Sequence, residues 1–184
     1  MGPTLFALNL HLVRKYLLRR IESTLPVRVV QQPLDNLCWA TCYRMIDNWV
    51  VPVNGLSWCR HARCVSNGPV CSSPKPGCNV PRLTSVVRND WLALGYPKTV
   101  HQPNAMTVPA VRASIKAGIP VMIFLEYKSQ AIGHFCLIVG TARIRFGVDT
   151  SFVIADPLKE KLIEREATDL LIHGTWRESW EISQ

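Results

Sequence analysis

The sequence predicts an α+β protein in which helices come first along the chain and antiparallel strands come later. Two observations support this prediction. Before residue 118, apolar residues recur at three- and four-residue steps in several segments, which is the helical period. From residue 119 on, short runs rich in Val, Ile and Phe alternate with turn residues, which is typical of strands.

Length and composition agree with one folded domain. The chain has 184 residues, 48% of them apolar, and no run of about 18 consecutive apolar residues that would predict a transmembrane helix. The net charge of +8 can attract acidic partners. Since no arginine-glycine or aromatic-basic pattern accompanies it, we expect no nucleic-acid binding. We divide the chain into an N-terminal extension, residues 1–27, and a domain, residues 28–184.

The extension contains an amphipathic basic segment. Residues 5–20, "LFALNLHLVRKYLLRR", predict a helix packed on the domain. Its start has neither the early charge nor the small-residue cleavage site of a secretory signal. A propeptide, a junction with a larger parent protein and a membrane-surface helix remain alternatives, and membrane contact is the one we least expect.

The helices of the domain follow in order. Residues 38–50, "CWATCYRMIDNWV", form one apolar face and Pro52 ends the helix. Turn-forming residues then predict a long loop over 52–80. Asn79 is expected to cap a second helix that ends at Gly95. A third helix is expected from Thr107 to Ala117, closed by Gly118.

The strands come next. The strand-like segments are residues 119–127, 133–144, 151–157, 160–166 and 177–182. Residues 167–173, between the last two of these strands, predict a helical turn.

The seven cysteines form two groups. They are Cys38, Cys42, Cys59, Cys64, Cys71, Cys78 and Cys136. The four from Cys59 to Cys78 lie in the loop and predict local disulfides, hence an oxidising environment, with three possible pairings. A zinc site is the alternative, but gaps of four, six and six residues differ from the paired short spacings of structural zinc sites. We therefore expect no metal and no cofactor.

Cys38 is the candidate nucleophile. The thiolate is the reactive form of cysteine, and both a helix N-terminus and a neighbouring imidazolium favour it. Cys38 opens its predicted helix, so a histidine is the missing partner. His134 begins the apolar strand "GHFCLIVG" directly after Gly133, which we expect to leave the ring open to approach. The other four histidines are expected elsewhere: His11 in the N-terminal extension, His61 in the cysteine loop, His101 in a Pro/Asn-rich connection and His173 near the C-terminus.

Two further residues complete the candidate site. A catalytic imidazole needs an orienting acceptor, and Asp156 ends the strand "SFVIADP" where it can accept from His134. Asp149, in a hairpin turn, is its rival. Gln32 precedes Cys38 by six residues, and its amide is the candidate donor to an oxyanion, with the Cys38 N–H. Gln31 is the weaker alternative for that role.

Together these residues carry a resemblance. "Q-x5-C-W" before a helix, then "GHxxxIVG", then an apolar strand ending in Asp resembles the papain-like cysteine proteases over residues 28–182. Within them the chain is similar to the bacterial secreted and effector branch, with its staphopain-like enzymes and avirulence effectors. "CWAT" stands where that branch often has "CWAA", and "CSSPKPGCN" is similar to its cysteine-containing loop. Asp stands where plant papain has Asn.

The resemblance implies a fold and a set of roles. It implies a helical N-terminal lobe that carries Cys38 and an antiparallel β-sheet C-terminal lobe that carries His134 and Asp156. Cys38 is then the nucleophile, His134 the base and later the acid, Asp156 the orienting group and Gln32 the oxyanion donor. Without the extra cysteine of the plant "CGSCW" motif, the plant-type disulfides are not carried over.

The function predicted is therefore a cysteine endopeptidase acting on a protein or peptide through a Cys38 thioester. The branch implies a bacterial toxin or effector, secreted or delivered into a target cell, with a cognate inhibitor or immunity protein as a possible partner. A papain-fold acyl or amide transferase is one alternative. A disulfide-stapled binding module without activity is the other.

The remaining apolar and thiol residues near these motifs are expected to pack in the core. They are Trp39, Cys42, Cys136, Trp176 and Trp180.

Overall fold

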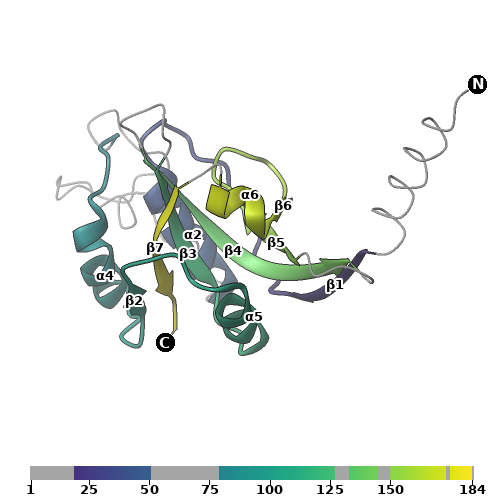
Figure 1. Cartoon of the computed structure of the whole chain (residues 1–184). Helices are drawn as coiled ribbons and strands as arrows, with labels where there is room; N and C mark the ends of the chain where they lie inside the picture. The colour runs from purple at the N-terminus through teal and green to yellow at the C-terminus, as the bar shows by residue number, and fades with distance from the viewer. Residues whose placement is uncertain (1–18, 51–78, 127–132, 145–149, 173–174, 184) are drawn as a thin grey trace, which may run out of the picture.

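The computed structural model describes residues 19–50, 79–126, 133–144, 150–172 and 175–183, and shows a mixed α+β structure with an antiparallel sheet (Figure 1). Its helices are α2 (Cys38–Val50), α4 (Thr84–Ala93), α5 (Val108–Lys116) and α6 (Ala167–Ile172). Its strands are β1 (Arg19–Thr24), β2 (Val100–Gln102), β3 (Val121–Glu126), β4 (Gly133–Ile144), β5 (Thr150–Ala155), β6 (Ile163–Glu166) and β7 (Thr175–Glu181). Within these ranges, every helix is too short or too polar to cross a membrane.

The seven described strands form one sheet. Six of them follow the order β2-β7-β3-β4-β5-β6, β1 pairs with β4 off this path, and every pairing is antiparallel. Strand β4 is the longest, with 12 residues, and carries three partners. Strand β3 pairs with its first half and β1 with its second half, since Thr24 lies opposite Gly140. The β1 backbone approaches so closely that a Cβ at Gly140 would lie 2.8 Å from the Ser23 carbonyl oxygen.

Most predicted elements are confirmed. Helix α2 begins at Cys38 and ends at Val50, and the later strands and the short α6 occupy the predicted segments. Helix α5 begins after Thr107, whose hydroxyl accepts from the Ala110 N–H, and Gly118 follows with a positive φ of 79°. These are the usual signals that start and stop a helix.

The predicted cap of α4 is wrong. The helix begins at Thr84 and its N-cap is Leu83, which makes no side-chain cap bond. Pro81 disfavours helical geometry in the residue before it, so a helix beginning at Asn79 would be interrupted at once. The Asn79 side chain instead accepts from the Asn36 N–H at 2.8 Å. The predicted end holds, because Gly95 has a positive φ of 96°.

The segment from Arg19 to Thr24 differs from the prediction of a basic helix over 5–20. For Arg19 and Arg20 the helix is wrong, because both lie in β1 and pair with the far half of β4. Residues 1–18 lie outside the described part of the chain. Leu25 and Val27, which follow β1, are buried in the core. The chain from Arg19 on is thus built into the sheet.

The core has a sheet side and a helical side. Helix α2 packs against β4, and Figure 1 shows it against the strands, with α4 and α5 toward the lower edge of the view. Three aromatic rings join α2 to α4: Tyr43 lies 4.5 Å from Trp91, and Trp91 lies 5.2 Å from Tyr96, between ring centroids. Such edge-to-face contacts stabilise beyond the area they bury. The core therefore holds α2 firmly between the sheet and α4.

The pairing of β4 with β5 brings two predicted site residues, His134 and Asp156, to the same end of the sheet. Leu137 lies opposite Ala155, so Asp156 follows β5 beside the start of β4. His134 is three residues before Leu137, at that same end of the sheet. Antiparallel register thus brings together two residues 22 positions apart in sequence.

Candidate active site

Cys38 is the first residue of α2 and is 7% exposed. Its position follows from the sequence, since the turn over residues 34–37 precedes a run with an apolar face that packs on β4. The N–H groups of a first helical turn have no partner within the helix. They give this end of α2 a partial positive charge, which favours an anion at the thiol.

His134 and Asp156 form a hydrogen-bonded pair. The His134 Nε2 lies 2.8 Å from the Asp156 Oδ1, and the two side chains are 8% and 15% exposed. The same carboxylate oxygen accepts from the Leu158 N–H at 2.9 Å. Asp156 is therefore held from two directions, and its orientation in turn fixes the His134 ring.

The His134 ring also contacts Cys38. The Cys38 thiol is close enough to the ring for hydrogen bonding to it to help raise the pKa of His134. Because Nε2 faces Asp156, Nδ1 is the ring nitrogen left for the sulfur. The imidazole lies between a carboxylate and a thiol, which is the arrangement that a base-activated nucleophile requires.

The surroundings of His134 favour its charged form. Burial by itself would lower the pKa of His134, but the hydrogen bonds to Asp156 and Cys38 and the negative charges of both raise the pKa from 6.5 to about 9. The ring is therefore an imidazolium at neutral pH.

Asp156 is shifted in the opposite direction. Burial would raise the pKa of Asp156, but hydrogen bonds from His134 and the Leu158 N–H, with the positive charges of His134 and Lys159, lower the pKa below 3.8. The carboxylate thus stays ionised from neutral pH down to below pH 3.8. The pair is charged on both sides near neutrality.

Gln32 lies near the site but directs its amide elsewhere. Its Nε2 donates to the Leu34 carbonyl at 3.0 Å and to the Asp35 carbonyl at 2.8 Å. Both carbonyls belong to the turn before α2. These two contacts use both amide protons. They do not test whether Gln32 donates to an oxyanion, so that role stays a prediction. Gln31, its alternative, is exposed.

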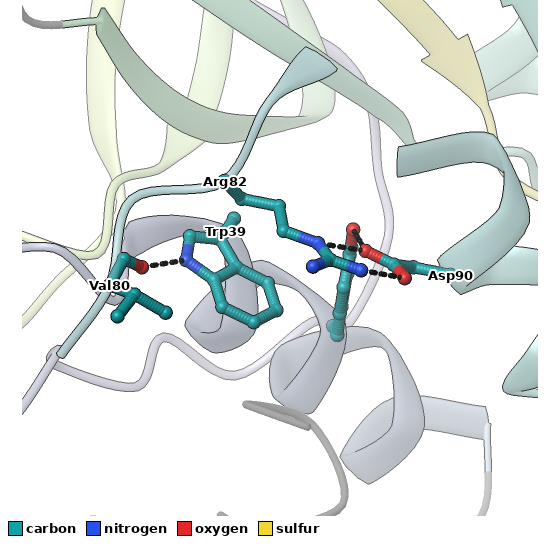
Figure 2. A network of polar contacts seen from close by, with 5 residues as sticks. Trp39, Val80, Arg82 and Asp90 are labelled. Atoms are coloured by element: carbon teal, nitrogen blue, oxygen red, sulfur yellow. Dashed lines mark hydrogen bonds and ion pairs between the residues drawn. The ribbon is translucent and has the colours of Figure 1, made fainter. Parts of the chain in front are cut away.

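Trp39 anchors the segment that follows the cysteine loop. Its indole Nε1 donates to the Val80 carbonyl at 3.0 Å, and the guanidinium of Arg82 lies 5.3 Å from the ring centroid (Figure 2). Arg82 also forms a two-pronged ion pair with Asp90 of α4. Trp39 is buried, as predicted, and its contacts tie α2 to residues 80–90.

Asp90 is the buried centre of this network. Its carboxylate is 1% exposed and also accepts from the Tyr43 hydroxyl at 3.1 Å. Burial, followed by the charge of Asp90, raises the pKa of Tyr43 well above its usual value of 10, which keeps the hydroxyl as a donor. The composition of the sequence offers no signal for this network, because its members are up to 51 residues apart.

Cys42 and Cys136 are buried free thiols, as predicted. Burial raises the pKa of both thiols. The charges of Cys136, Cys38 and Asp156 raise the pKa of Cys42 further, and those of Asp156 and Cys38 raise the pKa of Cys136. They therefore stay protonated and act as packing beneath the site. Trp176 and Trp180 are also buried, as expected of core residues.

The space beside His134 differs from the prediction. Gly133 was expected to leave the ring open to approach. A Cβ at Gly133 would lie 1.8 Å from the Phe124 Cζ, so the Phe124 ring already fills that space. The glycine is needed because β3 places an aromatic ring against the start of β4.

A second histidine–carboxylate pair escaped the sequence prediction. The His101 Nε2 lies 2.7 Å from the Glu178 Oε2, and the His101 ring stacks on Trp180 with centroids 5.1 Å apart. His101 was assigned to a connection, but it lies in β2, which pairs with β7. A three-residue strand gives too short a pattern to detect from sequence.

Several predicted residues lie outside the described ranges. They are His11, His61, His173, Asp149, Cys59, Cys64, Cys71 and Cys78. The choice between disulfides and zinc in the cysteine loop thus stays a prediction. In the described part of the chain, no three His, Cys, Asp or Glu side chains gather as a metal site.

Comparison with models of known protein families and with curated protein sequences finds no match. The functional argument therefore depends on the geometry of Cys38, His134 and Asp156.

Proposed function

We propose that this chain is a papain-like cysteine endopeptidase that hydrolyses peptide bonds through a thioester on Cys38. One observation carries the proposal: the His134 ring is hydrogen-bonded to Asp156, and the thiol of Cys38, which opens a helix, is close enough to the ring to raise the pKa of His134. The chain order of cysteine, histidine and aspartate is that of the family that the sequence resembles.

The proposal includes a two-lobed architecture. Helices α2 and α4, joined through Tyr43 and Trp91, would form the helical lobe. The sheet would form the other lobe. Support comes from the origin of the side chains, since the thiol belongs to a helix whereas His134 and Asp156 belong to the sheet. Peptide would bind where these two parts meet.

Acylation begins with the ion pair. The Cys38 thiolate attacks the carbonyl carbon of the scissile peptide bond, a C–S bond forms, and negative charge moves to the carbonyl oxygen. The Cys38 N–H, at the first turn of α2, is placed to donate to that oxyanion. The C–N bond then breaks while the His134 imidazolium gives its proton to the leaving amine.

Deacylation returns the site to its starting state. His134, now neutral, takes a proton from water as the water oxygen attacks the thioester carbon. The C–S bond breaks, Cys38 leaves as a thiolate and the carboxylic acid is released. His134 keeps the proton, so the imidazolium–thiolate pair is restored. Asp156 holds the ring in one orientation through both steps.

The biological setting is proposed from the resemblance alone. We place the enzyme among secreted or delivered bacterial toxins and effectors, acting on proteins of a target cell. A dedicated inhibitor protein would then protect the producing cell.

The test is a digest of peptides prepared from a whole proteome, compared between wild type and Cys38→Ala by mass spectrometry. The matched control is Cys42→Ala, which removes a buried thiol one helical turn away. We expect new peptide termini with wild type and the control but none with Cys38→Ala. Cleavage by Cys38→Ala would overturn the proposal. Amine-dependent products in place of new termini would assign the site to a transferase.

A further inference from the structure

We infer that a surface cavity beside α5 binds an organic primary ammonium, with Glu181 as the residue that recognises its charge. The cavity has a volume of about 580 Å³ and is lined by residues 102–107, one face of α5 and Glu181 at the end of β7. This is the size of cavity that takes a small ligand. The inference does not depend on the proposed function.

One wall of the cavity is a face of α5 that carries only methyl side chains over two turns. Ala110, Ala113 and Ala117 follow one another at steps of three and four residues, so they lie on the same side of the helix. Their small side chains leave the hollow. Met106 and Ile119 add apolar surface to its lining. The cavity therefore suits the hydrocarbon part of a ligand.

Glu181 is the one charged residue among the described residues that line the cavity. It is partly exposed, and its Oε1 is hydrogen-bonded to the Ser114 hydroxyl. The Ser114 Oγ also lies 3.1 Å from the Ala110 carbonyl oxygen, and a hydroxyl has a single proton for these two acceptors. The carboxylate is thus held in place with little compensation of its charge, so a cation is the ligand that complements it.

The free oxygen of this carboxylate favours an ammonium over a guanidinium. A guanidinium pairs best with both oxygens of a carboxylate. The Oε1 of Glu181 is already bonded to Ser114, and its Oε2 has no partner among the described residues. A primary ammonium is a compact charge with three donors, so one carboxylate oxygen is enough for it. The side-chain oxygens of Gln102 and Asn104 line the same cavity and offer further acceptors.

The wall opposite α5 is anchored to the sheet. The Ser179 hydroxyl donates to the Asn104 carbonyl at 3.0 Å and accepts from the Trp176 indole N–H at 2.9 Å. Met106, two residues after Asn104, is buried in the core. Residues 102–107 are therefore held at two points. A cavity with fixed walls requires little ordering when a ligand binds, which favours affinity.

The cavity lies apart from the candidate active site. In β3, Val121 lies opposite Glu181 of β7. Leu125, four residues further along β3, lies opposite His134 of β4. Four residues of an extended strand span about 13 Å. Glu181 and His134 thus lie at opposite ends of β3, and a ligand beside Glu181 is not a reactant at Cys38.

The probe for this site is cyclohexylmethylammonium, which joins an apolar ring to a primary ammonium. Its binding is measured by calorimetry and by the NMR shifts of the Ala110 and Ala113 amides. Cyclohexylmethanol is the neutral control of the same shape. A lysine side chain carries the same ammonium chemistry, so acetyl-lysine methylamide is the second probe, and the tighter of the two ammonium probes indicates whether the natural occupant is a small amine or a lysine of a protein.

Three variants locate the binding. Glu181→Gln removes the charge and keeps an oxygen for the Ser114 hydroxyl. Ala113→Leu fills the cavity from an exposed position on α5. Glu126→Gln is the matched control, because this carboxylate lies outside the cavity and pairs with Arg177. Circular dichroism verifies that each variant is folded.

We expect a Kd of about 1 mM or lower for the tighter ammonium probe, and binding of cyclohexylmethanol weaker by about tenfold. Glu181→Gln should weaken the ammonium probe by about tenfold as well, since it loses a hydrogen bond to a charged group. Ala113→Leu should remove the shift at Ala110. Glu126→Gln should leave the Kd unchanged within about twofold.

Three results would overturn the inference. They are equal affinity for the ammonium and the alcohol, an unchanged Kd in Glu181→Gln, and no binding of either ammonium probe at about 10 mM. Each is read from binding alone, without peptide hydrolysis. The inference can therefore fail while the proposed function stands, and the loss of peptide hydrolysis would not affect it.

Discussion

The structure describes two histidine–carboxylate pairs with nearly the same N···O distance, in residues 79–126, 133–144, 150–172 and 175–183, and one of the two is a candidate active site. The His134 pair joins Nε2 to Asp156 at 2.8 Å, and the His101 pair joins Nε2 to Glu178 at 2.7 Å. The His134 pair is 8% and 15% exposed, the His101 pair 32% and 23%. The distance between a histidine and a carboxylate therefore does not identify a catalytic pair.

The difference is what lies on the other side of each ring. The ring of His134 lies close to the thiol of Cys38, which opens α2, whereas the ring of His101 stacks on Trp180. A stacked indole offers packing but no group to activate. Under the proposed function, the thiol supplied by a second element of the fold, α2, is what would make the His134 pair reactive.

Loss of His134 is the change with the largest expected effect on activity, and loss of His101 is its control. His134→Ala removes the base and acid of the proposed mechanism, so kcat/KM should fall by about 10²–10⁴. His101→Ala should change kcat/KM less than about twofold, because that ring touches no part of the site. Peptide hydrolysis measured for both variants tests the comparison, and equal losses would break it.

The two carboxylates should differ as the two histidines do: loss of the Asp156 charge should reduce activity, and loss of the Glu178 charge should not. Asp156→Asn keeps an acceptor but removes the charge that raises the pKa of His134, so we expect kcat to fall by roughly 10² or more. The alkaline limb of its pH–rate profile should also move to lower pH. Glu178→Gln should leave both unchanged. An Asp156→Asn enzyme with the wild-type profile would show that Asp156 does not set the charge of His134.

The wild-type pH dependence follows from the shifted groups. Above pH 9 the His134 ring loses its proton, so kcat/KM should decline about tenfold per pH unit. Stability follows the same linkage. Because the folded pKa of about 9 exceeds 6.5, the stabilisation from His134 is complete below pH 6.5 and is lost as pH rises through 9.

Asp156 sets the opposite limit on stability. Its folded pKa lies below 3.8, so its contribution is present above that pH and is lost as pH falls further. The difference in Tm between wild type and His134→Gln should therefore be largest between about pH 4 and 6.5. A difference that is constant from pH 4 to 10 would contradict this linkage.

The ion pair of Arg82 with the buried Asp90, beside Trp39, extends the comparison of buried and exposed pairs to the free energy of unfolding. Arg82→Ala leaves the Asp90 carboxylate buried without its cation, which should reduce the free energy of unfolding by about 3–5 kcal/mol. Arg177→Ala is the matched control, because its pair with Glu126 is about half exposed and should contribute at most about 1 kcal/mol. Urea denaturation of both variants measures these differences, and equal losses would show that the buried pair is not special.

The smallest expected effect on the free energy of unfolding comes from breaking the pair of His101 with Glu178. Glu178→Gln should lower the free energy of unfolding by less than about 1 kcal/mol, since both side chains remain partly exposed. Urea denaturation at pH 5 and pH 8 checks this value. A larger loss would mean that the His101 pair supports the β2–β7 edge of the sheet.

Local patterns were sufficient to predict much of the fold. Helix α2 and strands β3 to β5 have strong apolar patterns bounded by proline or glycine, and the predicted triad lies at their ends. Strand β1 was missed because Arg19 and Arg20 continue a helical pattern, and only their partners in β4, more than 100 residues away, stabilise a strand.

The contacts of polar side chains were the part that sequence could not supply. Asn79 has the composition of a helix cap, but its side chain bonds to Asn36, 43 residues earlier. Gln32 has the spacing of an oxyanion donor, but its amide bonds to Leu34 and Asp35. Each side chain has several partners within reach, and the choice depends on tertiary packing.

The most direct measurement is a search for an acyl group on Cys38. Wild-type protein is mixed with a slowly hydrolysed peptide ester, quenched in acid and digested, and the fragment containing Cys38 and Cys42 is sequenced by mass spectrometry. The account predicts the mass of the acyl group on Cys38, absent in His134→Ala at the same time point. An acyl group on Cys42, or hydrolysis with no acylated cysteine, would contradict it.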